Sequence, residues 1–312
     1  MDVYNGPNGN LPTLPDPVVT IGSFDGIHIG HRALLERVIE RAGERGGTAV
    51  LLTFDPHPQR VVAPGTAPAL LTTREEKLEL LEESGLEAVV FLRFDRALSD
   101  MEAEDFVQKI LVGRIGVRYL VFGHDHAFGR GRRGRPELLR RMAPDLGFEF
   151  EVMEAVRDNG ETITSTLIRG HLEKGNVERA NELLGRSYGV AGVVVRGERR
   201  GERIGIPTAN VVPSTTEKCI PGNGVYAVRA EVLGEIYQGA CNIGIRPTFG
   251  GEERTIEAHL FDFAEDIYGE SIKVSFIKKL RDERSFDGPE ALREQIGSDI
   301  EEARRILAQE VG

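Results

Sequence analysis

Two histidines stand three residues apart in the stretch "IGSFDGIHIGH", directly after a short apolar run. His28 and His31 would suit a metal site, a general base, or contact with a group that is already charged. A zinc site needs a third ligand, and the other histidines supply no obvious one. Gly22, Gly26 and Gly30 let the backbone approach a ligand closely. The stretch therefore favours contact with phosphate.

A second candidate site is the stretch "RGERRGERIGIPTAN", in which Gly197, Gly201 and Gly205 form a flexible chain able to wrap phosphates. It is not a Walker A loop, because no Gly-Lys-Ser/Thr follows. Thr208 and Asn210 come two residues apart, so on an extended chain their side chains face the same side. Two neutral oxygens suit a magnesium ion whose other ligands are ATP phosphates and waters.

The length and composition of the chain limit the kind of fold that can position these residues. A chain of 312 residues suits two domains of roughly 150 residues each. The hydrophobic share of 40% and the charged share of 29% are typical of a soluble globular protein. No apolar run approaches the ~18 residues that a membrane-spanning helix needs. The first 17 residues have no secretory signal pattern and are interpreted as a polar lead-in.

The net charge of −11 argues against broad binding to nucleic acid or to an anionic membrane. Phosphate must then be bound by local groups such as helix N-termini, glycine loops and a few arginines, which points to small nucleotides. The two cysteines, Cys219 and Cys241, lie in no paired metal spacing. They indicate buried reduced thiols of a cytoplasmic protein, with a disulfide as the alternative.

The first half of the chain alternates apolar strands with amphipathic helices, which predicts a doubly wound parallel α/β sheet. Thr73 with Glu76 and Ser99 with Glu102 are interpreted as capping boxes that open helices. A Gly-Gly pair ends the helix that follows the histidines. The expected strands are 17–22, 48–54, 88–94, 117–123 and 148–156, and the clearest helices are 31–47 and 136–147.

From about residue 187 the pattern changes to short strands separated by glycine or proline. Six of them in succession predict a small closed antiparallel β-barrel, with a C-terminal helix over 289–309 packed against its outside. A helical segment over 167–185 joins the halves, which gives domains 1–185 and 186–312. The expected barrel strands are 188–195, 208–212, 224–232, 237–245, 255–263 and 271–280.

The motifs in their order resemble one family along almost the whole chain: the bacterial bifunctional riboflavin kinase/FAD synthetases. The first half carries "GSFDGIHIGH", "LLTFDPHP", "FGHDHAFGRGRRG" and "TSTLIR". The second carries "RGERIGIPTANV", "GVYAV", "NIGIRPTF", "IEAHLFDF" and "RDERSF". The resemblance implies a Rossmann-like nucleotidylyltransferase domain that makes FAD from FMN, followed by a barrel that phosphorylates riboflavin.

For the first domain, the resemblance implies that His28 and His31 bind the triphosphate of ATP and stabilise charge as its α-phosphorus is attacked. The nucleophile is the phosphate of FMN, already anionic, so positioning and electrostatic stabilisation suffice without a base. An ordinary helix cap beside a surface arginine is the alternative for the "TSTLIR" residues. The residues expected to contact nucleotide or pyrophosphate are Gly22, Phe24, Asp25, Ser165, Thr166 and Arg169.

Asp125 is expected near the flavin of the first domain. His126 and Ala127 stand where the family has an aromatic and a basic residue, whereas Phe128 and Gly129 match. The arginines that follow, in "RGRRGR", fit a solvated turn as well as they fit phosphate contact. The stretch 54–58, "FDPHP", is expected to shape the base pocket, with its histidine structural.

For the second domain, the resemblance makes Glu257 the general base that takes the proton of the riboflavin 5′-hydroxyl. The strand pattern alone would leave this carboxylate facing solvent, and His259 is expected to be structural. Thr208 and Asn210 are implied as the magnesium site. The segment expected to close over the flavin contributes Arg281, Glu283 and Phe286.

The predicted substrates and products are riboflavin, FMN, FAD, ATP, ADP and pyrophosphate, with Mg²⁺ and no zinc. Two other interpretations stay open: a chain that retains only the kinase, and a flavin-binding regulator or carrier without turnover. The intact set of His28, His31, Thr208, Asn210 and Glu257 argues against a carrier, because binding alone would not need all five. Product formation from riboflavin and ATP separates the three.

Overall fold

The computed structural model describes residues 1–6, 13–197, 201, 205–248 and 251–309. The chain forms two compact units, Met1–Thr164 and Ser165–Gly312. Cys219 and Cys241 are both buried, and they form no disulfide with each other. None of the helices in the described part of the chain has the length and apolarity that crossing a membrane requires.

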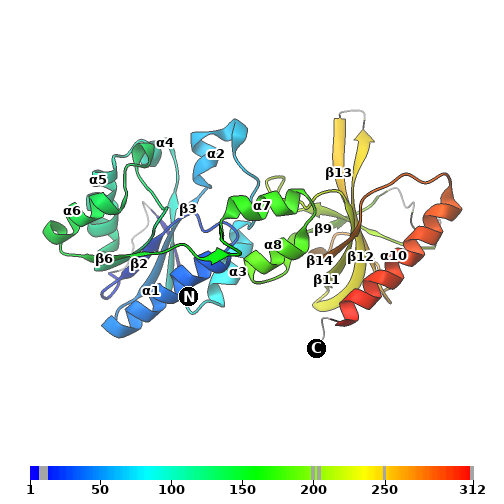
Figure 1. Cartoon of the computed structure of the whole chain (residues 1–312), viewed down its shortest axis with the longest axis horizontal. Helices are drawn as coiled ribbons and strands as arrows, with labels where there is room; N and C mark the ends of the chain where they lie inside the picture. Colours follow the sequence, from blue (N-terminus) through cyan, green and yellow to red (C-terminus); the bar gives the residue numbers. More distant parts are fainter. Residues whose placement is uncertain (7–12, 198–200, 202–204, 249–250, 310–312) are drawn as a thin grey trace. The chain divides into compact units, whose positions relative to one another are not determined.

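The first unit is built on a six-stranded sheet in the order β1-β4-β3-β2-β5-β6, with every neighbouring pair parallel. One apolar cluster joins the sheet to α1 and α3, and another joins it to η2 and α6, so both faces are covered (Figure 1). The predicted doubly wound sheet is confirmed. The strands are β1 (Asp2–Gly6), β2 (Val18–Ile21), β3 (Ala49–Asp55), β4 (Ala88–Arg93), β5 (Tyr119–Gly123) and β6 (Glu149–Met153).

The helices of this unit begin and end largely where the sequence indicates. Gly46 in the left-handed region ends α1, and Thr73 and Glu76 form both halves of the predicted capping box of α3. A short two-stranded ribbon, β7 (Arg157–Asp158) and β8 (Glu161–Thr162), precedes the end of the unit. The helices are α1 (Ile29–Arg45), α2 (Pro58–Val62), η1 (Pro64–Thr66), α3 (Arg74–Glu82), α4 (Arg96–Ser99), α5 (Ala103–Asp105), the π-helical η2 (Phe106–Ile115), η3 (Arg130–Arg132) and α6 (Pro136–Leu146).

Two sequence predictions in this unit are wrong. The polar lead-in contains β1, which pairs with β4 from Asp2 opposite Ala88 onward. Its stability comes from backbone bonds to an edge that β4 presents, so an apolar pattern is not needed. The Ser99–Glu102 capping box does not form: Ser99 ends α4, and α5 begins after Glu102 without a side-chain cap. The cap in this region is Asp95, whose carboxylate accepts the Leu98 N–H at 2.9 Å.

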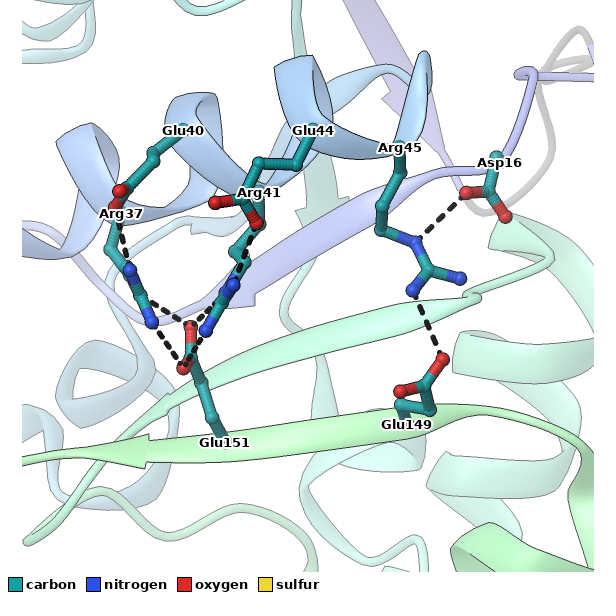
Figure 2. Close-up of polar contacts among 8 residues, drawn as sticks. All are labelled: Asp16, Arg37, Glu40, Arg41, Glu44, Arg45, Glu149 and Glu151. Atoms are coloured by element: carbon teal, nitrogen blue, oxygen red, sulfur yellow. Dashed lines mark hydrogen bonds and ion pairs between the residues drawn. The ribbon is translucent and has the colours of Figure 1, made fainter.

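Helix α1 is anchored to the edge strand β6 by ion pairs (Figure 2). Arg37 Nε lies 2.7 Å from Oε1 of Glu151, and Arg41 Nη2 lies 3.1 Å from its Oε2. Arg45 reaches Glu149 at 3.0 Å. Burial opposes the charged form of Glu151, but hydrogen bonds from both arginines outweigh it and lower its pKa to about 2. The C-terminal half of the helix that starts at the histidines is thereby held against β6.

The second unit is a closed six-stranded barrel in the order β10-β13-β12-β11-β14-β9, all antiparallel, as predicted. Helix α10, red in Figure 1, packs Ala303, Ile306 and Leu307 on the outside of the barrel. Its strands are β9 (Tyr188–Val195), β10 (Ala209–Pro213), β11 (Gly224–Val232), β12 (Glu235–Thr248), β13 (Gly251–Leu260) and β14 (Ser271–Arg281), followed by α10 (Pro289–Gln309).

The joining segment consists of two helices, α7 (Ser165–Glu173) and α8 (Val177–Leu184), which belong to the second compact unit. Asn181 of α8 donates to Phe276 O of β14 at 2.8 Å and accepts the Tyr188 N–H at 2.7 Å. These helices therefore pack with the barrel. The functional division into 1–185 and 186–312 stays a prediction.

Candidate active sites

The first candidate site lies where β2 ends and α1 begins, at the carboxyl edge of the parallel sheet. His28 is the N-cap of α1, and its Nδ1 accepts the His31 N–H at 3.3 Å. The two imidazole rings stack with centroids 3.7 Å apart, and Phe24 stacks on His31 at 4.6 Å. The N–H groups of a helix N-terminus favour anions. The predicted histidines thus lie together at a position suited to phosphate.

The loop that carries the histidines has an unusual backbone. Phe24 and Ile27 have positive φ angles of 45° and 39°, and both side chains are buried. A Cβ on Gly22 would lie 3.0 Å from the Phe24 ring, so a larger residue there would crowd the stack. Such a conformation costs free energy and persists only when its surroundings hold it.

Contacts from the segment before α3 hold this loop. The buried Asp25 carboxylate accepts the N–H groups of Leu71 and Thr72, each at 3.0 Å, and Gly26 N–H donates to Thr72 Oγ1 at 3.0 Å. Asp25, predicted at the nucleotide, therefore has a carboxylate that bonds the protein's own backbone. These bonds tie the histidine loop to the segment before α3.

Lys77 and Thr53 hold the same loop from the other side. Lys77 Nζ donates to Ser23 O at 2.7 Å, and Thr53 Oγ1 donates to the same oxygen at 3.2 Å. Burial lowers the pKa of Lys77. Sequence reasoning missed this residue, although a signal exists: Lys77 lies four residues before the buried Leu81, on the apolar face of α3.

The predicted flavin loop follows β5. Asp125 is exposed, and His126 lies edge-on to Phe122 with ring centroids 5.1 Å apart. Burial lowers the pKa of His126 to about 4, so its ring is neutral at physiological pH. Phe128 packs in the core, and a Cβ on Gly129 would meet Ala103 Cα at 2.6 Å.

The arginines beyond this loop lie at the surface. Arg130 and Arg133 are exposed and pair with Glu102 at 3.3 and 3.8 Å. Arg132 donates to Asp125 O at 3.4 Å, and Arg135 is the N-cap of α6. Both interpretations of these arginines, as a solvated turn and as phosphate contacts, stay predictions.

Two other predicted segments of the first domain are helix starts. Ser165 and Thr166 open α7, and Arg169 one turn later is buried. In "FDPHP", His57 caps α2 by accepting the Gln59 N–H at 3.2 Å, in keeping with a structural part.

The second candidate site is defined by strand register. Glu257 of β13 pairs with Asn210 of β10 on one side and with Asn242 of β12 on the other. Directly opposed residues in antiparallel strands point to the same face. Ala240, two residues before Asn242, packs on α10, so this face is the outside of the barrel. Three adjacent strands thus place a carboxylate between two amides.

The segment before β10 is shaped by glycine. A Cβ on Gly197 would lie 2.3 Å from Asn210 Nδ2, and one on Gly201 would lie 2.2 Å from Ile206 O. Gly205 has a φ of 79°. His259 Nδ1 lies 2.7 Å from Pro207 O, which ties β13 to the start of the Thr208–Asn210 segment. Of the glycine-rich stretch, 198–200 and 202–204 lie outside the described residues.

The predicted flavin segment of the barrel follows β14. Arg281 pairs with the buried Asp299 of α10 at 2.8 Å, and its guanidinium lies over the Phe286 ring, 5.6 Å from the centroid. Glu283 is exposed and accepts the Asn223 side-chain N–H at 3.4 Å. The guanidinium of Arg281 thus contacts both Asp299 of α10 and the ring of Phe286 in the segment after β14.

Comparison with known proteins covers both units. The FAD synthetase family model matches residues 12–167, and the riboflavin kinase family model matches residues 184–307. The bifunctional riboflavin kinase/FMN adenylyltransferase of Bacillus subtilis is 37% identical over 93% of this chain and 92% of its own length. This chain belongs to the bifunctional riboflavin kinase/FMN adenylyltransferase family.

Other relatives extend over both halves. The family member from Escherichia coli K12 is 40% identical over 96% of each chain. A crystal structure described as a macrolide-efflux protein from Streptococcus pneumoniae matches with a TM-score of 0.89 and 31% identity, over 97% of this chain and 99% of that one. The resemblance predicted from the motifs is therefore confirmed.

Whether the predicted magnesium site suits the metal depends on the donor atoms that its residues offer. Thr208, just before β10, and Asn210 of β10 are half-buried and offer a hydroxyl and an amide oxygen. Oxygen donors with free positions for phosphate oxygens are what magnesium requires, so the residues fit. Asn242 opens the motif "NIGIRPTF" but is assigned no role from the sequence, because only the register of β12 with β13 brings it beside Glu257.

Proposed function

We propose that this chain makes FAD from riboflavin in two steps, each with its own ATP. The domain 186–312 transfers the γ-phosphoryl group of ATP to riboflavin and gives FMN and ADP. The domain 1–185 transfers AMP from ATP to FMN and gives FAD and pyrophosphate. The observation that carries the proposal is that one chain matches both family models, with a candidate site in each matched half.

In the kinase step, the riboflavin 5′-hydroxyl attacks the γ-phosphorus as Glu257 takes its proton, and the bond to the ADP oxygen breaks. A neutral hydroxyl must lose its proton, which is why a carboxylate is needed here. Thr208 and Asn210 would hold magnesium by their side-chain oxygens. A magnesium ion bound there would neutralise charge on the transferring phosphoryl group. The pairing of Asn210 with Glu257 supports this proximity of metal site and base.

In the adenylylation step, a phosphate oxygen of FMN attacks the α-phosphorus of ATP, and the bond to pyrophosphate breaks. His28 and His31 stabilise the charge that builds on the phosphates, and the α1 N-terminus adds its N–H groups. Gly22, Phe24 and Asp25 set the loop that presents them. The stacked imidazoles at this helix end support the assignment.

The remaining contacts complete both sites. Ser165, Thr166 and Arg169 receive the pyrophosphate from the start of α7, and Asp125 contacts the flavin of the first domain. Gly197, Gly201 and Gly205 contact the ATP of the kinase domain. Arg281, Glu283 and Phe286 form the flavin side of the kinase site. The reduced thiols of Cys219 and Cys241 support a cytoplasmic location.

The test is product analysis with the full chain. Purified protein is incubated with riboflavin, MgATP and pyrophosphatase, and FMN is separated from FAD by chromatography. Sequential appearance of FMN and then FAD is expected. Formation of FMN alone would support a chain that retains only the kinase activity. Flavin binding without either product would support a carrier or regulator without turnover.

A further inference from the structure

The strongest polar contact between α10 and the end of β14 joins Arg281 to Asp299. Arg281 Nε donates to Asp299 Oδ1 at 2.9 Å, and Nη2 donates to Oδ2 at 2.8 Å. Asp299 is only 5% exposed, whereas surface pairs of this kind stand in water. Two parallel charge-assisted bonds to a buried carboxylate fix the arginine in position and orientation.

This pair is part of a larger set that holds segment 282–287, here called the strap. Gln295 of α10 donates to Asp299 Oδ1 at 2.7 Å and accepts a bond from Arg284 of the strap. Two guanidinium groups lie over the Phe286 ring, with Arg281 Cζ 5.6 Å and Arg284 Cζ 4.9 Å from its centroid. One face of α10 therefore holds the strap at its start and at its middle.

The strap lies over the same barrel face as the candidate kinase site. A Cβ on Gly244 would meet Glu283 Oε1 at 2.3 Å, so the Glu283 carboxylate rests directly on β12. Gly244 follows Asn242 by two residues on that strand, and Asn242 pairs with Glu257. The position of Glu283 relative to Glu257 thus depends on how the strap is held.

We propose that Asp299 is a positioning residue for riboflavin: it holds Arg281 so that the strap stays seated beside the Gly244 end of the kinase site. Asp299 does not touch substrate or reacting atoms. The inference rests on the proposed function of the barrel as the kinase, and extends it to α10. Helix α10 thereby determines flavin affinity in addition to packing on the barrel.

The chain offers a matched control on the same helix. Arg304 of α10 makes a two-point pair with Asp262, both bonds at 2.9 Å, in the loop after β13. Asp262→Asn and Asp299→Asn each remove one carboxylate charge from an Asp–Arg pair that ties α10 to the barrel. Only Asp299 is linked to the strap. The asparagine keeps the size of the side chain but turns one acceptor into a donor facing the arginine.

The experiment measures riboflavin phosphorylation by the full-length chain, with KM for riboflavin, KM for ATP, kcat and Tm for each variant. Asp299→Asn should raise the riboflavin KM by about tenfold or more, the size expected for losing charge-assisted hydrogen bonds. The KM for ATP should change less than about twofold, since its predicted contacts lie on β10 and the stretch before it. Asp262→Asn should leave the riboflavin KM as in the wild type.

Equal riboflavin KM values in the two variants would overturn the inference. A fall in kcat and a rise in both KM values that accompany a fall in Tm would also overturn it, because Asp299 would then have a purely structural role. If Asp299→Asn does not fold, Gln295→Ala decides: about a threefold rise in riboflavin KM supports the inference, and an unchanged KM overturns it. Wild-type protein that makes no FMN would instead refute the proposed function itself.

Discussion

In the first unit the candidate site lies on a loop, whereas in the second it lies on paired strands. The histidine loop has two non-glycine residues at positive φ and is held by side chains and backbone from the segment near residue 72. Glu257 needs no such support, because the pairing of β13 with β10 and β12 fixes its neighbours. The first site therefore depends on contacts from a remote segment, and the second depends on strand register.

The largest expected effect separates the two sites by their nucleophiles. Glu257→Ala removes the proposed base from a step that starts with a neutral hydroxyl, so FMN formation should fall on the order of 10²–10⁴-fold. FMN supplied directly should still become FAD at a near-normal rate, because that nucleophile is already an anion. Rates for both steps, measured separately, check this. Loss of FAD formation from supplied FMN would contradict the division of labour.

The converse variant tests the loop. His28→Ala combined with His31→Ala removes the charge stabilisation at the α1 N-terminus, and FAD formation should fall about 10²–10³-fold while FMN accumulates. Raising the pH should restore little activity, since the proposed role of the histidines is to stabilise charge and not to carry a proton. A pH profile of the double variant with supplied FMN measures this. Strong recovery at high pH would indicate a base.

A smaller effect is expected from loosening the loop without touching the histidines. Thr72→Val keeps the volume but removes the oxygen that accepts the Gly26 N–H. The free energy of unfolding of the first unit should fall by about 1–3 kcal/mol, the cost of a lost buried hydrogen bond. FAD formation should fall several-fold, and FMN formation should not change.

The matched control for Thr72→Val is Thr48→Val. Thr48 Oγ1 donates to Pro15 O at 3.0 Å, at the start of β3 and so at the opposite end of the sheet from the histidines. It should leave both rates unchanged. Equal losses of FAD formation in the two valine variants would show that the contact to Gly26 has no special part.

The smallest effect concerns the anchor of α1. The folded pKa of Glu151 is about 2, below the ordinary carboxyl value, so its pairs with Arg37 and Arg41 stabilise the fold above about pH 4.5. That stabilisation is lost as pH falls toward 2. Because the side chains are partly exposed, each pair contributes about 1 kcal/mol or less.

Glu151→Gln should therefore flatten the acid limb of stability against pH, measured by urea unfolding between pH 7 and pH 3. Glu44→Gln serves as control, since Glu44 pairs only with Arg41 among the contacts drawn in Figure 2 and is half exposed. An acid limb as steep as that of the wild type in the Glu151 variant would contradict the assignment.

Periodicity and motifs were enough to predict the elements and most of the fold. Alternating apolar runs located five of the six sheet strands and all six barrel strands, because burial on one or both faces shapes those sequences. Strand β1 was missed, because its residues, "DVYNG", gain their place from β4 and carry no apolar run. The Ser99–Glu102 box failed because Asp95 caps the helix in that region.

The sequence indicated which residues are candidates for the two sites, but it did not indicate the contacts that hold those residues in place. Histidine and glycine spacing singled out the loop for which phosphate contact is predicted, but Thr72 lies 46 residues from Gly26 and no local pattern links them. The same holds for Asn242, because only the register of β12 with β13 brings it beside Glu257. Likewise, the sequence motif included Arg281 without indicating that Asp299 would occupy its guanidinium. Contacts between residues far apart in sequence leave no local pattern.

The alternation of side chains along β13 limits how this protein can change in length. Removing one residue within Gly251–Leu260 would turn the position of Glu257 toward the barrel interior and bring a buried residue such as Ala258 to the outer face. Removing two would keep the face but slide the carboxylate past Asn210 and Asn242. Viable insertions and deletions in the kinase half should therefore gather in the connections, such as Phe261–Glu270 between β13 and β14, and avoid the three strands that meet at Glu257.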